Sequence, residues 1–260
     1  GNIGLVFMRQ VASSNDYTHV IVSRSPVDAR ACYSNKGIID LAPLFLHDSP
    51  TSKSHTLFSD VDEIVSNLRP EFVQLFEAFT EKGRSNSDQE IFDYIVGILG
   101  SVAYRNRYAS LLKIDFPRVP IPKMDTLFAK VSALGGRLIA LQLLEEKIPL
   151  TMQPKYVGSK EVVVGKVTHK EDVLWIDSGA KDPKNRGSGF AGVSEDVFRF
   201  ELGGYQICEK WFKDRRGQSL SQTERDHARI MLASISKIIA IKAEIDQIIE
   251  EHGGFPDAFV

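Results

Sequence analysis

The sequence has few of the residues that mark several common protein classes. Its 260 residues include 2 cysteines, Cys32 and Cys208, which lie too far apart for a disulfide framework or a metal site and are expected to be reduced thiols. Its longest apolar runs, such as residues 39–46, fall far short of the roughly 18 to 20 residues that a membrane span needs. We therefore expect neither a disulfide scaffold nor a membrane protein, and we expect the cytoplasm as its compartment.

An excess of charge of one sign is also missing. The formal net charge is -2, from 32 basic and 34 acidic residues, which argues against a wholly basic nucleic-acid-binding protein. Hydrophobic residues make up 43% of the chain and charged residues 25%, as in an average soluble globular domain, so a folded core is expected. Nucleic acid could bind only to a face on which basic residues gather.

Motifs of catalysis are absent as well. No Pro-Pro pair occurs, so the Asn/Asp-Pro-Pro-aromatic loop of an amino-methyltransferase is missing. Gly165-Lys166 is followed by Val167 rather than by Ser or Thr, so there is no ATP-binding phosphate loop. No Gly-x-Ser-x-Gly elbow occurs, and the six histidines have no metal-ligand spacing. We therefore expect no catalysis, no metal and no cofactor in this chain by itself.

The spacing of apolar residues predicts an α+β fold, with β-rich recognition segments and a helical support that includes a long C-terminal helix. Strands are expected at residues 5–10, 17–24, 156–167 and 172–177. Helices are expected at residues 71–82, 88–112, 124–146, 205–212 and 221–251. Residues 178–192 hold four glycines and no period, and we expect an exposed loop there.

Local signals fix some of these boundaries. Ser87 with Glu90, and Ser221 with Glu224, have the spacing of capping boxes at helix starts. Gly97 and Gly100 favour a break or bend within residues 88–112. Residues 115–122 carry three prolines, which remove hydrogen-bond donors and bias their neighbours toward extended geometry. This segment is expected to be a rigid strap that crosses the domain.

Basic residues gather at two places along the sequence. Five lie between Arg105 and Lys123 against the single acid Asp115, and four lie between Lys210 and Arg216 against one acid. One such cluster is more typical of a solvated helix face than of a binding site. Several clusters together favour phosphate binding modestly, because that binding needs Lys and Arg on one face even when the whole chain is nearly neutral.

Several sequence blocks together resemble a known family. They are residues 91–95 (IFDYI), 104–108 (YRNRY), 112–120 (LKIDFPRVP), 203–215 (GGYQICEKWFKDR), the helix start at 220–221, and residues 33–36 leading into 43–46. These blocks span most of the chain and resemble the C-terminal specificity domain of Type ISP restriction-modification enzymes and related adenine-specific DNA methyltransferases. The resemblance implies sequence-specific binding of double-stranded DNA, as the target-recognition part of a longer bacterial polypeptide.

The resemblance also implies how the chain is divided and what it works with. Residues 1–55 would be a β-rich segment continuing from an upstream methyltransferase, residues 56–150 a helical segment, and residues 151–260 a mixed β and loop segment ending in the long helix. The missing parent would use S-adenosylmethionine, with ATP and Mg if it is a full restriction enzyme with nuclease and translocase. The first residues, GNI, carry no initiator methionine, and we expect an excised fragment.

The matching blocks are largely apolar or turn-forming, so they are expected to hold the domain together. Lys and Arg elsewhere are expected to hold phosphates, while loop side chains read base edges, Arg or Lys on guanine and Asn or Gln on adenine. The candidate DNA-binding residues are Arg9, Gln10, Tyr33, Asn35, Lys36, Arg105, Arg107, Lys181, Lys184, Asn185, Arg186, Arg215 and Arg216.

Two functions of other classes also fit the sequence. A protein-interaction scaffold, linking the methyltransferase to other modules, would use the long amphipathic helix to contact a partner and would show no salt-dependent DNA binding. Alternatively, the chain could complete a methyltransferase active site, and would then be active only together with the missing N-terminal portion.

Overall fold

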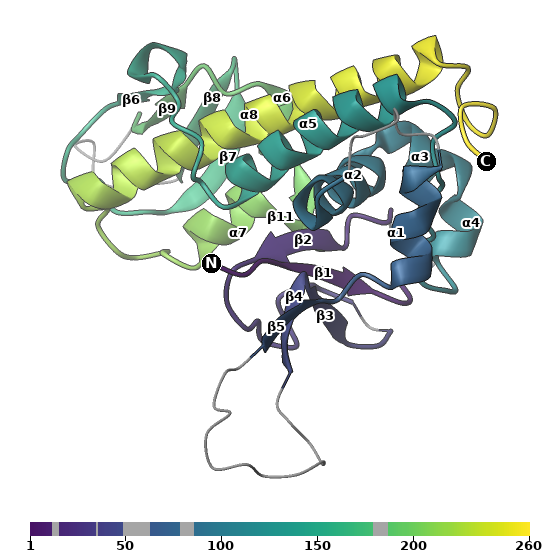
Figure 1. The fold of residues 1–260 in the computed structure, drawn as a ribbon. Helices are drawn as coiled ribbons and strands as arrows, with labels where there is room; N and C mark the ends of the chain where they lie inside the picture. Colours follow the sequence, from purple (N-terminus) through teal and green to yellow (C-terminus); the bar gives the residue numbers. More distant parts are fainter. Residues whose placement is uncertain (12–15, 35, 49–62, 79–85, 179–186) are drawn as a thin grey trace, which may run out of the picture.

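The computed structural model describes residues 1–11, 16–34, 36–48, 63–78, 86–178 and 187–260. It confirms the predicted α+β class: small antiparallel sheets combine with helices, and the longest described helix is the last (Figure 1). None of the helices in these described ranges has both the length and the apolar character to cross a bilayer.

The N-terminal sheet contains the two strands predicted first. Strands β1 (Gly4–Met8), β2 (Val20–Ser23) and β3 (Ile39–Pro43) form an antiparallel sheet in the order β2-β1-β3. A separate hairpin follows, made of β4 (Phe45–Asp48) and β5 (Glu63–Ser66). Strand β1 is buried on both faces because it lies in the middle and helices cover the sheet. The turn expected between β1 and β2 lies, apart from Asp16, outside the described residues.

The helical layer begins with α1 (Pro70–Glu77) and α2 (Asp88–Gly100). The capping box of Ser87 and Glu90 is confirmed at the start of α2. The break or bend that Gly97 and Gly100 predict within residues 88–112 is confirmed, because α2 ends at Gly100 and the chain continues as α3 (Val102–Arg107) and α4 (Ala109–Leu112). Ser101 is extended, with ψ 130°, and its hydroxyl accepts a hydrogen bond from Tyr104 N to cap α3.

Helix α5 (Asp125–Gln142) packs closely along α2. A methyl group on Gly135 would lie 1.8 Å from Asp93 O, so only glycine allows this approach. The helix ends earlier than predicted, since Leu144 turns into positive φ at 57°. The proline strap (residues 115–122), which precedes α5, is confirmed as non-helical. The 3₁₀ turn η1 (Leu150–Met152) follows α5.

The second sheet has the antiparallel order β6-β9-β8-β7. Its strands are β6 (Lys155–Val157), β7 (Lys166–Lys170), β8 (Val173–Ser178) and β9 (Gly189–Ala191). The strand predicted over residues 156–167 is interrupted, because Gly158 has a positive φ of 98° and residues 158–165 leave the sheet. The loop predicted over residues 178–192 is wrong at its end, since β9 is a central strand whose Phe190 is fully buried.

The chain closes through α6 (Glu195–Phe198), the hairpin β10 (Glu201–Leu202) and β11 (Tyr205–Gln206), α7 (Ile207–Lys213) and α8 (Gln222–Glu251). The helix predicted at residue 205 begins two residues later, because Gly203 and Gly204 both have positive φ and turn β10 into β11. The capping box of Ser221 and Glu224 is confirmed at the start of α8.

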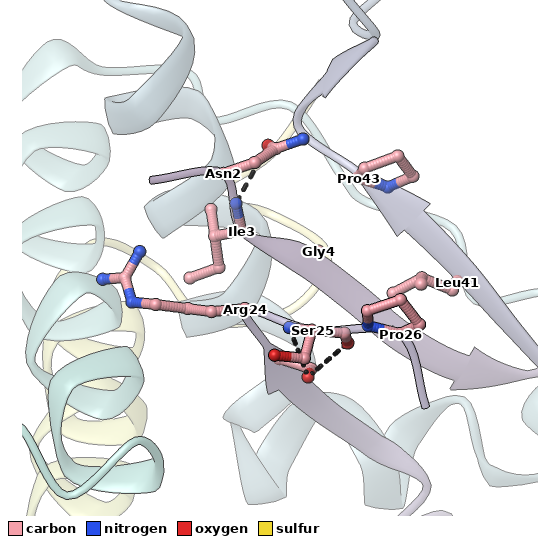
Figure 2. A pocket seen from close by; sticks show the side chains of 9 residues that line it. Asn2, Ile3, Gly4, Arg24, Ser25, Pro26, Leu41 and Pro43 are labelled. Carbon is pink, nitrogen blue, oxygen red and sulfur yellow. Dashed lines mark hydrogen bonds between the residues drawn. The ribbon is translucent and has the colours of Figure 1, made fainter. Parts of the chain in front are cut away.

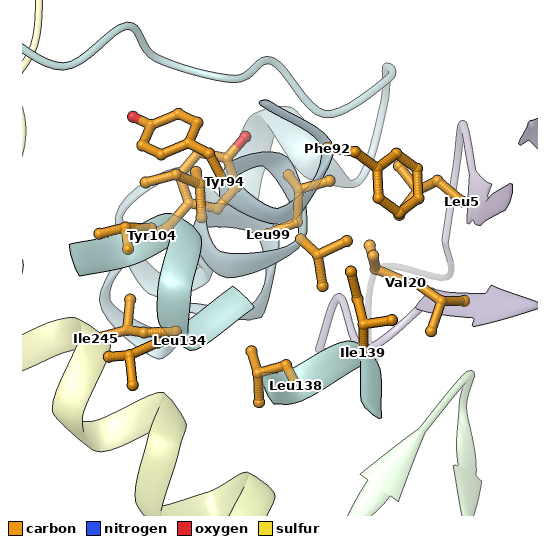
Figure 3. Close-up of a cluster of buried hydrophobic side chains, with 14 of the residues drawn as sticks. Leu5, Val20, Phe92, Tyr94, Leu99, Tyr104, Leu134, Leu138, Ile139 and Ile245 are labelled. Carbon is orange, nitrogen blue, oxygen red and sulfur yellow. The ribbon is translucent and has the colours of Figure 1, made fainter. Parts of the chain in front are cut away.

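Two hydrophobic clusters share α8, which acts as the brace that the sequence predicted. The first joins the N-terminal sheet, α2 and α5 to the C-terminal half of α8 through Ile238, Ile245 and other apolar residues (Figure 3). The second joins β8, β9 and α7 to the N-terminal half of α8, including Leu232. Phe200 packs against both clusters. The three-segment division of the chain stays a prediction.

Candidate nucleic-acid interface

The structure places the described candidates in three separate surface groups. Five of the predicted residues lie outside the described residues: Asn35, Lys181, Lys184, Asn185 and Arg186. The chain on either side of residues 179–186 belongs to paired strands, with Trp175 opposite Gly189. Ser188 N donates to the buried Asp177 Oδ2 at 2.8 Å. The segment with the predicted base-reading residues therefore connects two strands whose facing ends are fixed.

The first group forms where the loop after β2 meets the β10–β11 hairpin. Tyr33 N donates to Gly203 O at 2.6 Å, and His19 Nε2 lies 2.9 Å from Tyr33 O. The Tyr33 and Tyr205 rings lie 5.7 Å apart, and Tyr33 is 58% exposed. The loop from the first half of the chain is thus fixed against the second half, with an aromatic side chain left in solvent.

The two glycines of the hairpin are needed for this contact. A methyl group on Gly204 would lie 2.5 Å from Tyr33 O and 2.8 Å from His19 Nε2. Burial lowers the pKa of His19, which is fully buried and therefore favours the neutral ring. The Gly203-Gly204 part of the sequence block 203–215 is scaffold, as expected, and its role is to bring Tyr33 and Tyr205 together.

Exposed cations lie on the loop that carries Tyr33 and on α7, which follows Tyr205. Arg30 and Lys36 lie on the loop, and Lys210 Nζ lies 5.5 Å from the Tyr205 ring centroid while pairing with Asp214. We call Arg30, Tyr33, Lys36, Tyr205 and Lys210 the tyrosine surface. Lys, Arg and Tyr side chains are typical donors to phosphate oxygens, so this combination suits a nucleic-acid backbone.

The second group lies where α7 approaches the start of α8. Arg215 Cζ lies 3.7 Å from the Trp211 ring centroid, and its Nη1 donates to Trp211 O at 3.1 Å. Its Nε donates to Glu224 Oε1 at 3.2 Å. The hydrogen bonds from Ser221, with help from Arg215, lower the pKa of Glu224. Arg215 is therefore held in place by structural contacts, whereas its neighbour Arg216 is exposed.

The third group lies along the proline strap. Arg9 Nε is 3.5 Å from Asp115 Oδ1, and its guanidinium lies 5.5 Å from the Phe116 ring centroid. Gln10 Nε2 donates to Ile114 O at 3.2 Å. Arg107 is exposed on α3. Arg9 thus contacts the strap and Gln10 the residue before it. Their partners Ile114 and Asp115, together with Phe116, line an apolar cavity of about 380 Å³.

Arg105 differs from the exposed candidates because its guanidinium donates to backbone carbonyls inside the fold. Its Nε donates to Ser101 O at 3.3 Å and its Nη1 to Tyr17 O at 3.4 Å. Burial lowers its pKa. It lies beside Lys242 and Asp246 of α8, which the charge pattern of the sequence did not single out. The junction of α3 with α8 and with the segment before β2 therefore contains charged residues.

That charged junction centres on a buried amine. Lys242 is 8% exposed, lines a cavity of about 290 Å³, and lies 5.0 Å from the Phe200 ring centroid. Burial, with a smaller contribution from the nearby Arg105, lowers its pKa to about 7. Asp246, one helical turn along, accepts hydrogen bonds from Ser101 Oγ, Val102 N and Ala103 N. The signal in the sequence is Lys and Asp at i and i+4 within an Ile-rich helix.

Another cavity lies at the start of β1 and is smaller, at about 190 Å³. Figure 2 shows Asn2, Ile3, Arg24 and Pro43 around it. Arg24 donates to both carboxylate oxygens of Glu145, at 2.7 and 2.9 Å, and this pairing lowers the pKa of Glu145. The positive charge of Arg24 at this cavity is therefore already neutralised by Glu145.

Chemistry for catalysis is not assembled in the described part of the chain. No group of three or more His, Cys, Asp or Glu residues there could hold a metal ion. Burial raises the pKa of Cys32 to about 11 and of Cys208 to about 12, so neither thiol is an activated nucleophile. His169 bonds Val193 O at 2.7 Å and stacks on Phe198.

Comparisons with known proteins show the family and the fold to which the chain is similar. A family model described as the Type ISP C-terminal specificity domain matches residues 1–250. None of the curated proteins matches the chain. Three solved structures share its fold over 96% of its length. The first is the ATP-dependent Type ISP restriction-modification enzyme LlaBIII bound to DNA, with a TM-score of 0.61 and 16% identity. The second is a nuclease-deletion mutant of the Type ISP restriction-modification enzyme LlaGI in complex with a DNA substrate mimic, with a TM-score of 0.57 and 19% identity. The third is a DrdV–DNA complex, with a TM-score of 0.63 and 15% identity. The matched region makes up only 16%, 21% and 24% of those three chains.

Proposed function

Because the chain belongs to the family of Type ISP C-terminal specificity domains, we propose that it binds double-stranded DNA and supplies target recognition to a longer restriction-modification or adenine DNA methyltransferase polypeptide. The observation that carries the proposal is the family match over residues 1–250. The same fold occurs in chains that were solved on DNA, which supports it further.

The tyrosine surface is the proposed contact with the DNA backbone. It combines three cations with two tyrosines, and both halves of the chain contribute to it. Arg216 is exposed on the same half of the chain as Lys210 and is a further proposed phosphate contact. Arg30 and Lys36 would neutralise phosphates, while Tyr33 would donate from its hydroxyl.

Base reading is proposed for two segments that lie outside the described residues. Asn35 next to Lys36, and Lys181, Lys184, Asn185 and Arg186 between β8 and β9, have the side chains that pair with adenine or guanine. Arg107 stays a proposed phosphate contact. Arg9, Gln10, Arg105 and Arg215 already have partners within the protein, so we rank them below the exposed residues as DNA contacts.

The parent polypeptide is part of the proposal. An upstream methyltransferase would use S-adenosylmethionine, and a full restriction enzyme would add ATP and Mg, all outside this chain. The chain itself is proposed to bind DNA without a cofactor, and to act in the cytoplasm, where cellular DNA is methylated. The alternative of a scaffold that binds a partner through α8 loses support, because the apolar residues of α8 are buried in the two cores.

The test is selection of bound duplexes from a random-sequence library at low and moderate salt, with EDTA and without S-adenosylmethionine or ATP. We expect enrichment of one short asymmetric motif and a steep loss of affinity with salt. Replacing Arg30 or Lys36 with Ala should each reduce the slope of log K against log[salt] by about 1.

A matched control separates a DNA contact from a change in overall charge. Lys130 is an exposed lysine on α5, away from the tyrosine surface, and Lys130→Ala should leave the salt slope unchanged. Absence of both enrichment and salt-dependent binding, for this chain and for the longer parent, would reject DNA recognition. Equal effects of all three substitutions would reject the tyrosine surface while leaving DNA binding in place.

A further inference from the structure

The cavity beside the proline strap has the features of a preformed docking groove. One wall is the strap, and the other is α3 with α4, which contribute Tyr104, Tyr108 and Leu111. The strap is fixed because Tyr94 Oη donates to Pro120 O at 2.8 Å and Tyr104 Oη to Arg118 O at 2.6 Å. These hydrogen bonds fix the strap against α2 and α3.

The mouth of this groove exposes large apolar side chains. Leu111 is 56% exposed, Ile114 62% and Phe116 42%, and they lie within six residues of one another in sequence. Buried Leu112 and Tyr104 lie beneath them and line the same cavity. Contiguous exposed apolar groups next to a cavity are typical of interaction sites, whereas scattered ones are ordinary.

The rim of the groove is basic. The Arg118 side chain is 89% exposed and that of Arg9 is 61% exposed, and Arg107 is exposed on the neighbouring helix. Asp115 is the acid that lines the cavity, and both Arg9 and Arg118 lie within 4 Å of it. The rim therefore keeps a net positive charge around an apolar floor.

These features together indicate the occupant. A volume of about 380 Å³ accommodates a few large side chains and is far too small for a duplex. An apolar floor offers nothing to phosphate oxygens, but it does suit the apolar face of a helix laid in a groove. Carboxylates flanking that face would complement Arg9, Arg107 and Arg118.

We propose that the groove between the proline strap and the α3–α4 helices docks an acidic amphipathic protein segment. Its apolar side chains fill the cavity between Tyr108 and Phe116, and its carboxylates face the arginines of the rim. The segment is a different partner from DNA, so the proposal does not depend on the DNA-binding function. In the three DNA-bound structures the matched region is a minor part of the chain, so most of each of those polypeptides is available to contact it.

The test uses a fluorescein-labelled synthetic peptide of about 15 residues with Leu and Phe at helical positions i, i+3, i+4 and i+7 and Glu on the other faces. Fluorescence anisotropy with the whole chain should show saturable binding. The double variant Leu111→Glu with Ile114→Glu, and separately Arg118→Glu, should each weaken it at least about tenfold. All three side chains are exposed, so the fold should tolerate the changes, which circular dichroism would check.

The chain offers a matched control in η1. Leu150 and Met152 are 69% and 60% exposed, and replacing both with Glu adds the same charge away from the groove. This control should bind the peptide as the unmodified chain does. A peptide with Lys in place of every Glu should not bind.

Four outcomes would overturn the proposal: no saturable binding of the acidic peptide, equal binding of the Lys peptide, equal loss in the η1 control, or displacement of the peptide by a random DNA duplex. The last would assign the groove to nucleic acid. Loss of peptide binding in the groove variants, with DNA affinity retained, would establish the groove as a separate protein-binding site.

Discussion

Replacing Lys242 with Met should stabilise the fold, and the gain should depend on pH. The amine is 8% exposed, and burial lowers its pKa from the ordinary value of 10.5 to about 7. A fall of about 3.5 in pKa corresponds to about 5 kcal/mol by which the folded state disfavours the ammonium form, and relaxation and the cation–π contact with Phe200 reduce the net gain to about 2 to 4 kcal/mol.

The sign of the pH dependence follows from where the proton is bound. Below about pH 7 the ammonium is present in both states, and its burial destabilises the folded state in full. Between pH 7 and 10.5 the unfolded chain binds the proton and the folded chain does not, so wild-type stability rises with pH toward that of the variant. Arg105 and Asp246 also face this amine, and Asp16 and Glu201 line its cavity, so all four must stay charged across the range used.

Urea unfolding of the wild type and of Lys242→Met at pH 6.5, 7.5 and 9 measures the effect. The free energy of unfolding should be higher in the variant at pH 6.5, and the gap should shrink by about 2 kcal/mol by pH 9. Lys130→Met, on the exposed side of α5, is the control and should change stability by less than about 0.5 kcal/mol at every pH. A Lys242→Met chain that is less stable than the wild type by the same amount at all three pH values would refute the reasoning.

Two further substitutions test how the halves of the chain are joined. Asp246→Ala removes the acceptor for Ser101 Oγ and two backbone amides at the start of α3, and urea unfolding should show a loss of about 2 to 4 kcal/mol, while Glu244→Ala on the exposed side of α8 should show almost none. Gly204→Ala puts a methyl group 2.5 Å from Tyr33 O at a φ of 77°, so the melting temperature should fall by several degrees; an unchanged value would mean that the loop after β2 does not rest on this hairpin.

Local signals in the sequence predicted the parts of the fold that depend on neighbours in the chain. Both capping boxes mark helix starts, because Ser87 and Ser221 bond amides only three residues away. The three prolines kept the strap out of any helix for an equally local reason. The long helix was predictable because its apolar residues recur along thirty residues.

Glycines predicted a break within residues 88–112, but its position at Ser101 was less predictable, because part of its cause is distant. Asp246 lies 145 residues further along the chain and accepts hydrogen bonds at the start of α3. Strand β9 was missed for a related reason. It is three residues long and has no period of its own, and Gly189 is required because a methyl group there would lie 2.3 Å from Leu174 O of the neighbouring strand.

The candidate site likewise has features that local sequence predicts and features that depend on contacts between distant parts of the chain. A count of basic residues treats Arg105 and Arg107 alike, yet residues at positions i and i+2 of a helix do not share a face. Arg105 points to carbonyls inside the fold, and Arg107 is exposed. Tyr33 was named from composition, but its contact with Tyr205 was found only in the fold, since the hairpin that carries Tyr205 is about 170 residues away in sequence.

The position of the tyrosine surface makes the junction of the two cores important for DNA recognition. Its loop extends from the first core and its hairpin from the second, and Phe200, which packs on both, precedes that hairpin by one residue. The distance between the hairpin and the loop therefore stays fixed only if α8 holds the two cores in one arrangement. Arg105, Lys242 and Asp246 lie at that junction, and a substitution there would change the spacing of Tyr33 and Tyr205 without touching DNA. A loss of DNA affinity in such a variant would thus report on the junction, and only substitutions of exposed side chains such as Arg30 and Lys36 report on the contact itself.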